Sequence, residues 1–515
     1  MPRREEYVEI SPSDFFYRNK DIAGFDNPVR ATYMIVRELV ENALDACDRA
    51  GRAGNIYVAF RGKGSGVFQV EVLDDGIGVP EDEIPKAFGK VLYSSKYVLR
   101  QSRGTFGLGG TMALLYGQIT THEPFEVCSS IGDGYAARYR LRIDIQNNKP
   151  IVERKQRIKV PPGATFTLVK LTFEGNYERA KGKILEYLKQ TAIITPYINI
   201  VFRDPKGAIY VFPRATTKLP EEPKESKYHP YGVDVEVLKR LISETKTRNL
   251  VSFLSKSFQS MGRQTAIKVL KKARLDPEKN PRKLTDRELV KLVRALRSYD
   301  KFRAPDASCL SPVGEEALEK GIVKELRPEF VKVVQRPPSA YEGHPFIVEV
   351  GVAYGGGVPA TGDIVLYRFA NRIPLLYDAA SDVAYKVIRK IDWSTYYVDP
   401  ARTPMAVFVH ICSTKIPFKT VGKEFIADKP EIAREIELGI RECARALRSY
   451  ILKKIAKQRI VERYKIMRKY YEIISESLSE ILGRRIDPTP VLKRIAKPAG
   501  EEVSENGEAD NRENL

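Results

Sequence analysis

The segment 27–47 constrains this chain most, because it joins a strong amphipathic helix signal to an unusual set of polar side chains. Asn27-Pro28 offers a helix N-cap followed by a proline at the first helical position, where its missing N–H costs nothing. Apolar residues recur at helical spacing and predict a face that packs on a sheet: Val36, Leu39, Val40, Ala43 and Cys47. The other face carries Glu38, Glu41, Asn42 and Asp45.

Glu38 and Asn42 are four residues apart and are therefore neighbours on the helix surface. A glutamate can take a proton from water, and an amide oxygen can bind a hard cation. The pair suits the hydrolysis of a metal-bound phosphate. A solvated polar face is the alternative interpretation of this helix taken alone.

A second motif follows a predicted strand. Residues 67–73 alternate apolar and polar side chains, which indicates a half-buried strand, and they run into Asp74-Asp75-Gly76-Ile77-Gly78. A carboxylate at a strand end, followed by glycines, leaves room for a flat ring and offers an acceptor for its exocyclic amine. An ordinary Asp-Gly turn is the alternative.

The third motif is the glycine-rich stretch 103–111, which precedes the apolar run 112–115. The run predicts that a helix begins there. Backbone N–H groups of a glycine loop at a helix N-terminus form an anion site, so phosphates are the expected occupants.

In this order, the three motifs resemble those of the Bergerat-fold ATPases, the family of gyrase, a heat-shock chaperone, the mismatch-repair clamp and sensor histidine kinases. The Walker pattern that marks P-loop proteins is absent from the sequence. The resemblance implies an α/β sandwich that binds ATP and Mg²⁺. It implies that Glu38 is the general base, Asn42 the magnesium ligand and Asp74 the adenine contact, with Gly76 and Gly78 beside the adenine.

The resemblance also implies a set of phosphate-binding residues. They are Ser95, Lys96, Gly104, Thr105, Phe106, Gly107, Leu108, Gly109, Gly110 and Thr111. The family's later Gly-Thr box matches Gly163-Ala164-Thr165, with an inserted alanine.

The charge and the cysteine content of the chain indicate its partners and its cellular compartment. Lys and Arg number 86 against 66 Asp and Glu, and the formal charge of +20 is typical of proteins with polyanionic partners. The five cysteines include no Cys-x-x-Cys pair and the four histidines are dispersed, so we expect a protein of the reducing cytoplasm without structural zinc. No apolar run reaches membrane length, which argues against membrane insertion.

We expect an α+β protein that consists of several domains. Short alternating segments at 136–145 and 165–171 predict strands, 187–200 predicts a helix leading to a last strand, and a proline-bearing linker at 218–224 predicts the end of a first domain, 1–225. Residues 226–306 are basic, with helices predicted at 265–273 and 285–299. Such small helical modules often bind nucleic acid, and a solvated basic insert is the alternative.

The remainder predicts an α/β domain, 307–482, and a tail, 483–515, that is polar and expected to be disordered. Its strand candidates are 346–352, 365–369 and 405–411, and its helix candidate is 381–390. From about 431 to 482 the pattern predicts one helix of about 75 Å, too long to be buried throughout and therefore a stalk. A self-paired coiled-coil arm is the alternative.

Five segments sharpen the resemblance: 229–234, 343–346, 353–356, 367–375 and 391–393. They are similar to segments of the B-subunit family of archaeal DNA topoisomerase VI, a type IIB topoisomerase, along about residues 10–480. The resemblance implies that the middle module is a helix-two-turns-helix domain and that the third is a transducer domain. It also implies that Lys423, in the loop 419–424, reaches into the ATP site.

One position departs from the family. Close relatives often end the phosphate loop with a lysine where this chain has Gly110-Thr111. Lys96 and Lys423 are then expected to supply more of the positive charge.

By this resemblance, ATP binding would dimerise two copies of the chain around a segment of double-stranded DNA, and hydrolysis would reopen the gate. The resemblance places the double-strand break in the A subunit of an A2B2 assembly, and none of the 27 tyrosines of this chain has a context that marks a DNA-cleaving nucleophile. A stand-alone ATP-driven clamp and a non-enzymatic DNA-binding scaffold are the alternatives. A histidine kinase is disfavoured, because residues 1–37 contain no histidine to accept a phosphate.

Overall fold

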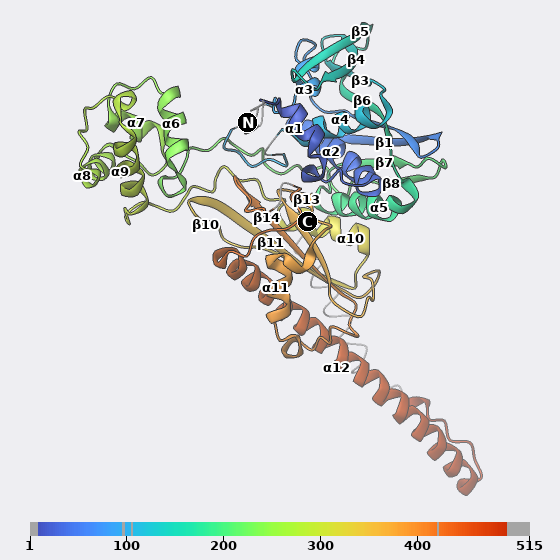
Figure 1. Ribbon diagram of the computed structural model, residues 1–515. Coiled ribbons are helices and arrows are strands. Elements are labelled where there is room, and N and C mark those ends of the chain that lie inside the picture. The colour runs from blue at the N-terminus through green and yellow to red at the C-terminus, as the bar shows by residue number, and fades with distance from the viewer. Residues whose placement is uncertain (1–8, 95–97, 105–106, 420–421, 492–515) are drawn as a thin grey trace, which may run out of the picture. The chain divides into compact units, whose positions relative to one another are not determined.

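The computed structural model describes residues 9–94, 98–104, 107–419 and 422–491 (Figure 1). The chain divides into two compact units. The first comprises residues 1–392 and 400–443, and the second comprises residues 393–399 and 444–515.

The first unit contains an eight-stranded sheet with the order β5-β4-β3-β6-β2-β1-β7-β8. Neighbouring strands are antiparallel except β1 and β7, which are parallel. The strands are β1 (Asn55–Gly64), β2 (Val67–Asp74), β3 (Phe125–Ile131), β4 (Tyr135–Asp144), β5 (Lys149–Lys159), β6 (Thr165–Glu174), β7 (Asn199–Arg203) and β8 (Ile209–Phe212).

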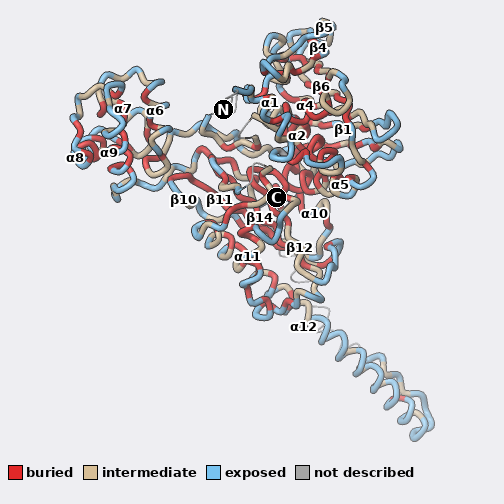
Figure 2. Tube along the Cα trace, in the orientation of Figure 1, coloured by how far each residue is buried: buried red, intermediate tan, exposed pale blue. Residues whose placement is uncertain are grey.

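Helices α2, α4 and α5 pack against this sheet and share one apolar core with it (Figures 1 and 2). The helices of this part are α1 (Pro12–Arg18), α2 (Pro28–Arg49), α3 (Ile84–Gly89), α4 (Gly109–Thr121) and α5 (Tyr177–Ile194). The predicted cap of α2 is confirmed, since the Asn27 side chain accepts a 2.9 Å hydrogen bond from the Arg30 N–H. The predicted apolar face is buried as well.

The helix predicted at 187–200 is wrong in its extent. Helix α5 begins at Tyr177, where the Asn176 side chain caps it by accepting from the Arg179 N–H at 3.1 Å. It ends at Ile194, two residues before Pro196, because a proline disfavours helical geometry at the residue before it. Residues 199–203 form β7 instead.

Four helices form a separate apolar cluster in the middle of the chain. They are α6 (Val235–Glu244), α7 (Leu250–Ser257), α8 (Arg263–Ala273) and α9 (Asp286–Arg297). The two helices predicted here from sequence correspond to α8 and α9. Thr285 and Glu288 form a reciprocal capping box that fixes the start of α9.

A second, six-stranded sheet follows, with the order β10-β11-β14-β12-β13 and with β9 paired to β11. Its strands β11 and β14 are almost wholly buried, which explains their continuous apolar runs. The elements are α10 (Glu315–Leu326), β9 (Phe330–Gln335), β10 (Ser339–Tyr341), β11 (His344–Tyr354), β12 (Val365–Ala370), β13 (Ile373–Pro374), α11 (Val383–Lys390) and β14 (Met405–Ser413). We call residues 309–392 and 400–443 the second-sheet region.

The predicted long helix is α12 (Pro430–Leu482). Gly439 lets its first turns approach the sheet closely, because an added Cβ would lie 2.7 Å from Val350 Cγ2. In the second unit the same helix is increasingly exposed, with Tyr470 64% and Ile481 77% accessible (Figure 2). None of the described helices has the length and apolarity needed to cross a lipid bilayer.

Candidate active site

A cavity of about 260 Å³ lies between α2, the end of β2, the start of α4 and the loop at 422–423. It collects most of the residues singled out from sequence, from segments that are far apart in the chain. Those that line it are Glu38, Asn42, Asp74, Gly78, Gly104, Gly107, Leu108, Gly109, Gly110, Thr111 and Lys423. Gly76 is not in the lining, and Ser95, Lys96, Thr105 and Phe106 lie outside the described residues.

The start of α4 lies directly over Glu38 and Asn42. A Cβ added at Gly109 would lie 1.5 Å from Glu38 Oε2, and one at Gly110 would lie 2.4 Å from Asn42 Nδ2. A side chain at either glycine would require the Glu38 carboxylate or the Asn42 amide to move, so the glycines let the helix start approach the two polar groups in their present positions. Within the described part of the chain, no side chain caps α4, so its first N–H groups face the site without an N-cap acceptor.

Asp74 occupies the end of β2 and is only 5% exposed. Its Oδ1 accepts a 2.9 Å hydrogen bond from the Gly76 N–H. Burial raises the pKa of this carboxyl to about 7, and the nearby charge of Asp75 adds to the rise. A carboxylate in a cavity with apolar walls is a specific acceptor for one polar edge of a ring.

Gly78 keeps this end of the cavity open. Its φ of 73° is in the left-handed region, and an added Cβ would lie 2.0 Å from the Ser130 carbonyl oxygen. The apolar side chains that line the cavity include Met34, Leu39, Ala43, Val72, Ile77, Val79, Met112 and Val169, of which Ile77 and Val79 flank Gly78 in the chain. This end of the cavity fits a flat, largely apolar ring.

Thr167 was missed by the sequence analysis, which matched Thr165 to the family's Gly-Thr box. The structure places Thr167 in the cavity lining, directly opposite Asp74 in the pairing of β2 with β6. Its Oγ1 lies 3.0 Å from Ser129 Oγ. Thr165 instead accepts a hydrogen bond from Arg52 at 2.9 Å and does not line the cavity.

Glu41 differs from its expected position on a polar helix face, since it is only 3% exposed. Its Oε1 accepts a 2.7 Å hydrogen bond from Arg37 Nε, and Arg37 Nη1 donates to the Gly422 carbonyl at 3.0 Å. Burial lowers the pKa of Arg37, but Glu41, Tyr33 and Glu38 together raise it by more, so this pKa stands above its ordinary value. This pair therefore fixes the loop at 422–423 to α2.

Lys423 comes from this loop and is only 7% exposed. Its Nζ donates to the Arg103 carbonyl at 3.0 Å and lies 3.6 Å from Glu41 Oε2. The structure thus brings a lysine of the second-sheet region to the cavity lined by Glu38 and Asn42.

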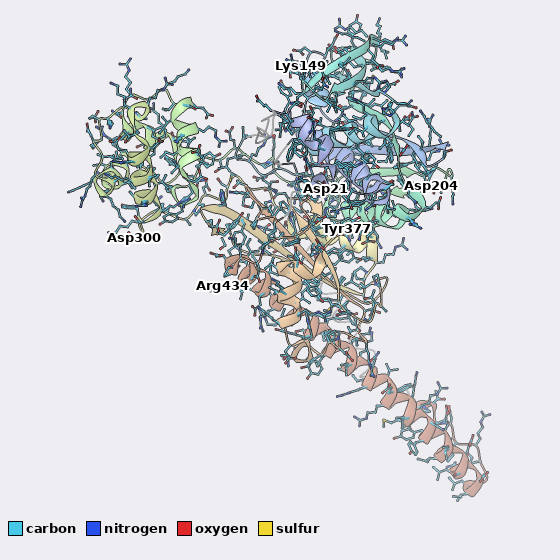
Figure 3. All side chains as sticks on the ribbon, in the orientation of Figure 1. Asp21, Lys149, Asp204, Asp300, Tyr377 and Arg434 are labelled. Carbon is cyan, nitrogen blue, oxygen red and sulfur yellow. The ribbon has the colours of Figure 1, made fainter. Side chains whose placement is uncertain are left out.

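Tyr377, labelled in Figure 3, marks a further contact between the second-sheet region and α2. Its ring centroid lies 5.4 Å from that of Tyr33, and the Arg30 guanidinium lies 5.5 Å above the Tyr377 ring. Arg30 also forms an ion pair with Glu424. The helix that carries Glu38 is therefore in contact with the second-sheet region at more than one point.

Asp74→Asn is expected to stabilise the protein at pH 8 and to have little effect at pH 4. The folded-state pKa of about 7 exceeds the ordinary value of 3.8, so the carboxyl disfavours the folded state progressively as the pH rises between these values. At about 1.4 kcal/mol for each pKa unit, relief of this penalty is worth at most about 4 kcal/mol. Thermal unfolding midpoints measured between pH 4 and pH 8 test this.

Asp204→Asn is the matched control, because Asp204 is buried as well but its carboxylate accepts from the Lys206 N–H at 2.9 Å and from the Ala208 N–H at 2.8 Å. We expect this variant to lower the midpoint at pH 8. A midpoint for Asp74→Asn that is unchanged at pH 8 would contradict the raised pKa.

Comparison with known protein families gives two matches. A family model described as "Topoisomerase VI B subunit, transducer" matches residues 305–463. A second, described as "Histidine kinase-, DNA gyrase B-, and HSP90-like ATPase", matches residues 27–171.

Two relatives are named as the B subunit of type 2 DNA topoisomerase 6. The protein of Metallosphaera sedula is 43% identical over 507 residues, which are 98% of this chain and 94% of that protein. The protein of Saccharolobus shibatae is 43% identical over 487 residues, which are 94% of this chain and 92% of that protein.

Among solved structures, the 43K ATPase domain of Thermus thermophilus gyrase B aligns with a TM-score of 0.41 and 13% identity. The alignment covers 88% of this chain and 98% of that one.

Proposed function

Since the chain belongs to the family of the type 2 DNA topoisomerase 6 B subunit, the ATPase component of a type IIB topoisomerase, we propose that its cavity binds ATP with Mg²⁺ and that ATP binding closes two copies on a DNA segment. The observation that carries the proposal is the approach of the α4 N-terminus to Glu38 and Asn42, with Asp74 also lining the cavity. This arrangement brings together hydrogen-bond donors for phosphate oxygens, a general base and a pocket for a flat ring.

The adenine would lie at the Asp74 end. The ionised Asp74 carboxylate accepts a hydrogen bond from the exocyclic amine, and Thr167 and Gly78 border the same space. Because the pKa of Asp74 is about 7, the carboxyl is about half ionised at pH 7 and nearly fully ionised only about one pH unit higher. ATP affinity would therefore fall as the pH drops below 7, and Asp74→Asn would remove that pH dependence.

The phosphates would bind at the glycine-rich segment. The uncapped N–H groups at the start of α4 are preorganised donors for anionic oxygens. Gly104, Gly107 and Leu108 line the same cavity. By the family resemblance we include Ser95, Lys96, Thr105 and Phe106 in the phosphate site.

Glu38 would act as the general base. Its carboxylate takes a proton from the water that attacks the terminal phosphorus, and it lies next to Gly109, where phosphate oxygens would bind. The Asn42 amide oxygen would hold Mg²⁺, which would neutralise charge on the phosphates. The donor set fits a magnesium ion that keeps several waters and the phosphates as its other ligands.

Partners follow from the family and from the exposed surfaces. We propose an A2B2 assembly in which the A subunit cleaves DNA and the exposed apolar residues of α12 contact it, among them Ile466, Tyr470 and Ile473. The proposed boundaries are 1–225 for the ATPase domain, 226–306 for a helix-two-turns-helix domain, 307–482 for the transducer with its stalk, and 483–515 for the tail. The charge of +20 favours contact with DNA phosphates.

The test is relaxation of supercoiled plasmid by the chain purified together with a candidate A subunit, with and without ATP and Mg²⁺. We expect relaxation that requires both chains and ATP, and that weakens steeply as the salt concentration rises. ATP hydrolysis without a partner and without relaxation would support a stand-alone clamp instead. DNA binding without hydrolysis would support a scaffold.

A further inference from the structure

Three residues directly before Gly104, Gln101 to Arg103, lead into the glycine-rich stretch and are each bound by the second-sheet region; we call them the lid base. Gln101 and Ser311 exchange two hydrogen bonds, from Gln101 Nε2 to the Ser311 carbonyl at 2.9 Å and from the Ser311 N–H to Gln101 Oε1 at 2.7 Å. The Ser102 carbonyl accepts from Asn371 Nδ2 at 3.1 Å. The Arg103 carbonyl accepts from Lys423.

Asn371 and Arg372 form the two-residue turn between β12 and β13. Both have positive φ, 46° and 65°, as expected for the tight turn of a hairpin. Asn371 exchanges two further hydrogen bonds with the Ser413 backbone, each 3.0 Å long. The side chain of Asn371 therefore bridges the second sheet and the lid base.

A series of buried hydrogen bonds holds Arg372, the second residue of the turn. The Arg372 N–H donates to His410 Nε2 at 3.0 Å, so the proton of the neutral ring resides on Nδ1, which donates to Glu349 Oε2 at 2.6 Å. The Glu349 carboxylate, fully buried, also accepts from the N–H groups of Val313 and Gly314 at 2.9 and 2.6 Å. The turn is thus attached rigidly to the sheet.

Asp48 links the turn to the lid base and to α2. Its Oδ2 lies 2.7 Å from Arg103 Nη1 and 3.2 Å from Arg372 Nη1, so one carboxylate oxygen serves two guanidinium groups. The Tyr197 hydroxyl donates to the other oxygen at 2.9 Å. Both arginines are at least 95% buried. Arg103 Nη1 also lies 3.0 Å from Asp45 Oδ1, so Arg103 would keep a carboxylate partner if the lid base and the turn moved apart. The buried guanidinium of Arg372 would lose the Asp48 carboxylate, which is unfavourable.

We propose that the Asn371-Arg372 turn is a positioning device that couples movement of the lid base to movement of the second-sheet region, separately from Lys423. The inference rests on the proposed function, in which the glycine-rich segment following the lid base binds the phosphates. Arg372 does not line the nucleotide cavity, so it acts through Asp48 and Arg103 and not on the reacting atoms. The two regions then change position together.

The test compares Arg372→Gln with wild type in the full complex with the A subunit. We expect the number of DNA strand passages per ATP hydrolysed to fall by about 5- to 100-fold, the usual range of a coupling free energy between two sites. Arg372→Lys keeps one charged donor and should restore part of this ratio. Asn371→Gly, which retains the positive φ, should also lower it.

Arg368→Gln is the matched control. Arg368 is a buried arginine of the same hairpin, but its partners, the Leu375 and Tyr377 carbonyls and Asp382, all lie in the second-sheet region. This variant should lose stability while the ratio of strand passage to hydrolysis stays as in wild type. Equal ratios in all variants, or an equal loss in Arg368→Gln and Arg372→Gln, would overturn the proposal.

Amide hydrogen exchange gives a readout that needs no topoisomerase activity. With a non-hydrolysable ATP analogue, wild type should show slowed exchange both at residues 101–104 and at 371–375, whereas Arg372→Gln should show it only at 101–104. Unchanged protection of 371–375 in the variant would overturn the coupling. Failure of wild type to relax DNA would refute the proposed function alone.

Discussion

Glu38→Gln is expected to lower the kcat of ATP hydrolysis by about 10²- to 10⁴-fold, the usual contribution of a general base, while ATP binding is largely retained. Glutamine has nearly the same shape as glutamate but cannot accept the proton of the attacking water. The side chain at position 38 lies against Gly109, and glutamine fills the same space there as glutamate. The variant should therefore keep the local packing. Single-turnover hydrolysis and equilibrium binding of ATP separate the two effects.

Glu81→Gln serves as the control, because the Glu81 carboxylate binds Lys155 at 2.6 Å and lies outside the cavity. It should hydrolyse ATP as wild type does. Hydrolysis by Glu38→Gln within about threefold of wild type would remove Glu38 as the base, since loss of a general base costs far more. Plasmid relaxation should disappear together with hydrolysis if each strand passage consumes ATP.

Local signals were sufficient to predict much of the fold. The cap at Asn27, the apolar periodicity of α2 and the continuous apolar runs of β11 and β14 act within short stretches of chain, and each predicted element is present. The start of α5 was missed although Asn176 is a good N-cap, because the helical pattern was read only from residue 187. The error concerned both boundaries, each of which depends on a few residues, and it extended the helix into the first two residues of β7.

The candidate site was predictable in part, because Glu38, Asn42, Asp74 and the glycine-rich segment carry recognisable motifs. The sequence pattern did not show which threonine, Thr165 or Thr167, belongs to the site, because the two are two residues apart and point to the same face of β6. Only the pairing of β6 with β2 shows which of them lies opposite Asp74.

Glu41 pairs with Arg37 four residues earlier, but the loop at 422–423 that contacts this pair lies hundreds of residues away. The contacts of the Asn371-Arg372 turn are equally distant in the chain, and no local pattern reveals either set. Glu41 is a charged residue on a helix face that carries other polar residues, and its sequence context predicts exposure. Its carboxylate is buried because Arg37 and the loop at 422–423 neutralise it. Long-range ion pairs of this kind are set by the tertiary structure, so a sequence pattern predicts which residues are polar but not where their partners lie.

Lys423→Met is expected to lower the rate of ATP hydrolysis by about 10²-fold or more, comparable with the loss of one preorganised donor to a developing anion. Methionine keeps much of the aliphatic length but removes the ammonium that lies at the cavity, 3.0 Å from the Arg103 carbonyl. We propose that this ammonium turns to the terminal phosphate when ATP binds. Because Lys423 belongs to the second-sheet region, its contact would make the position of that region depend on the presence of the γ-phosphate.

Lys419→Met is the control, since Lys419 is an exposed lysine of the same loop and is not among the residues that line the cavity. Its hydrolysis rate should equal that of wild type. The two variants should differ most in discrimination between ATP and ADP: wild type and Lys419→Met should bind an ATP analogue more tightly than ADP, and Lys423→Met should lose most of that difference. If Lys423→Met hydrolyses ATP as Lys419→Met does, the lysine only ties the loop to α2, and the γ-phosphate must be sensed by the lid base and its partners instead.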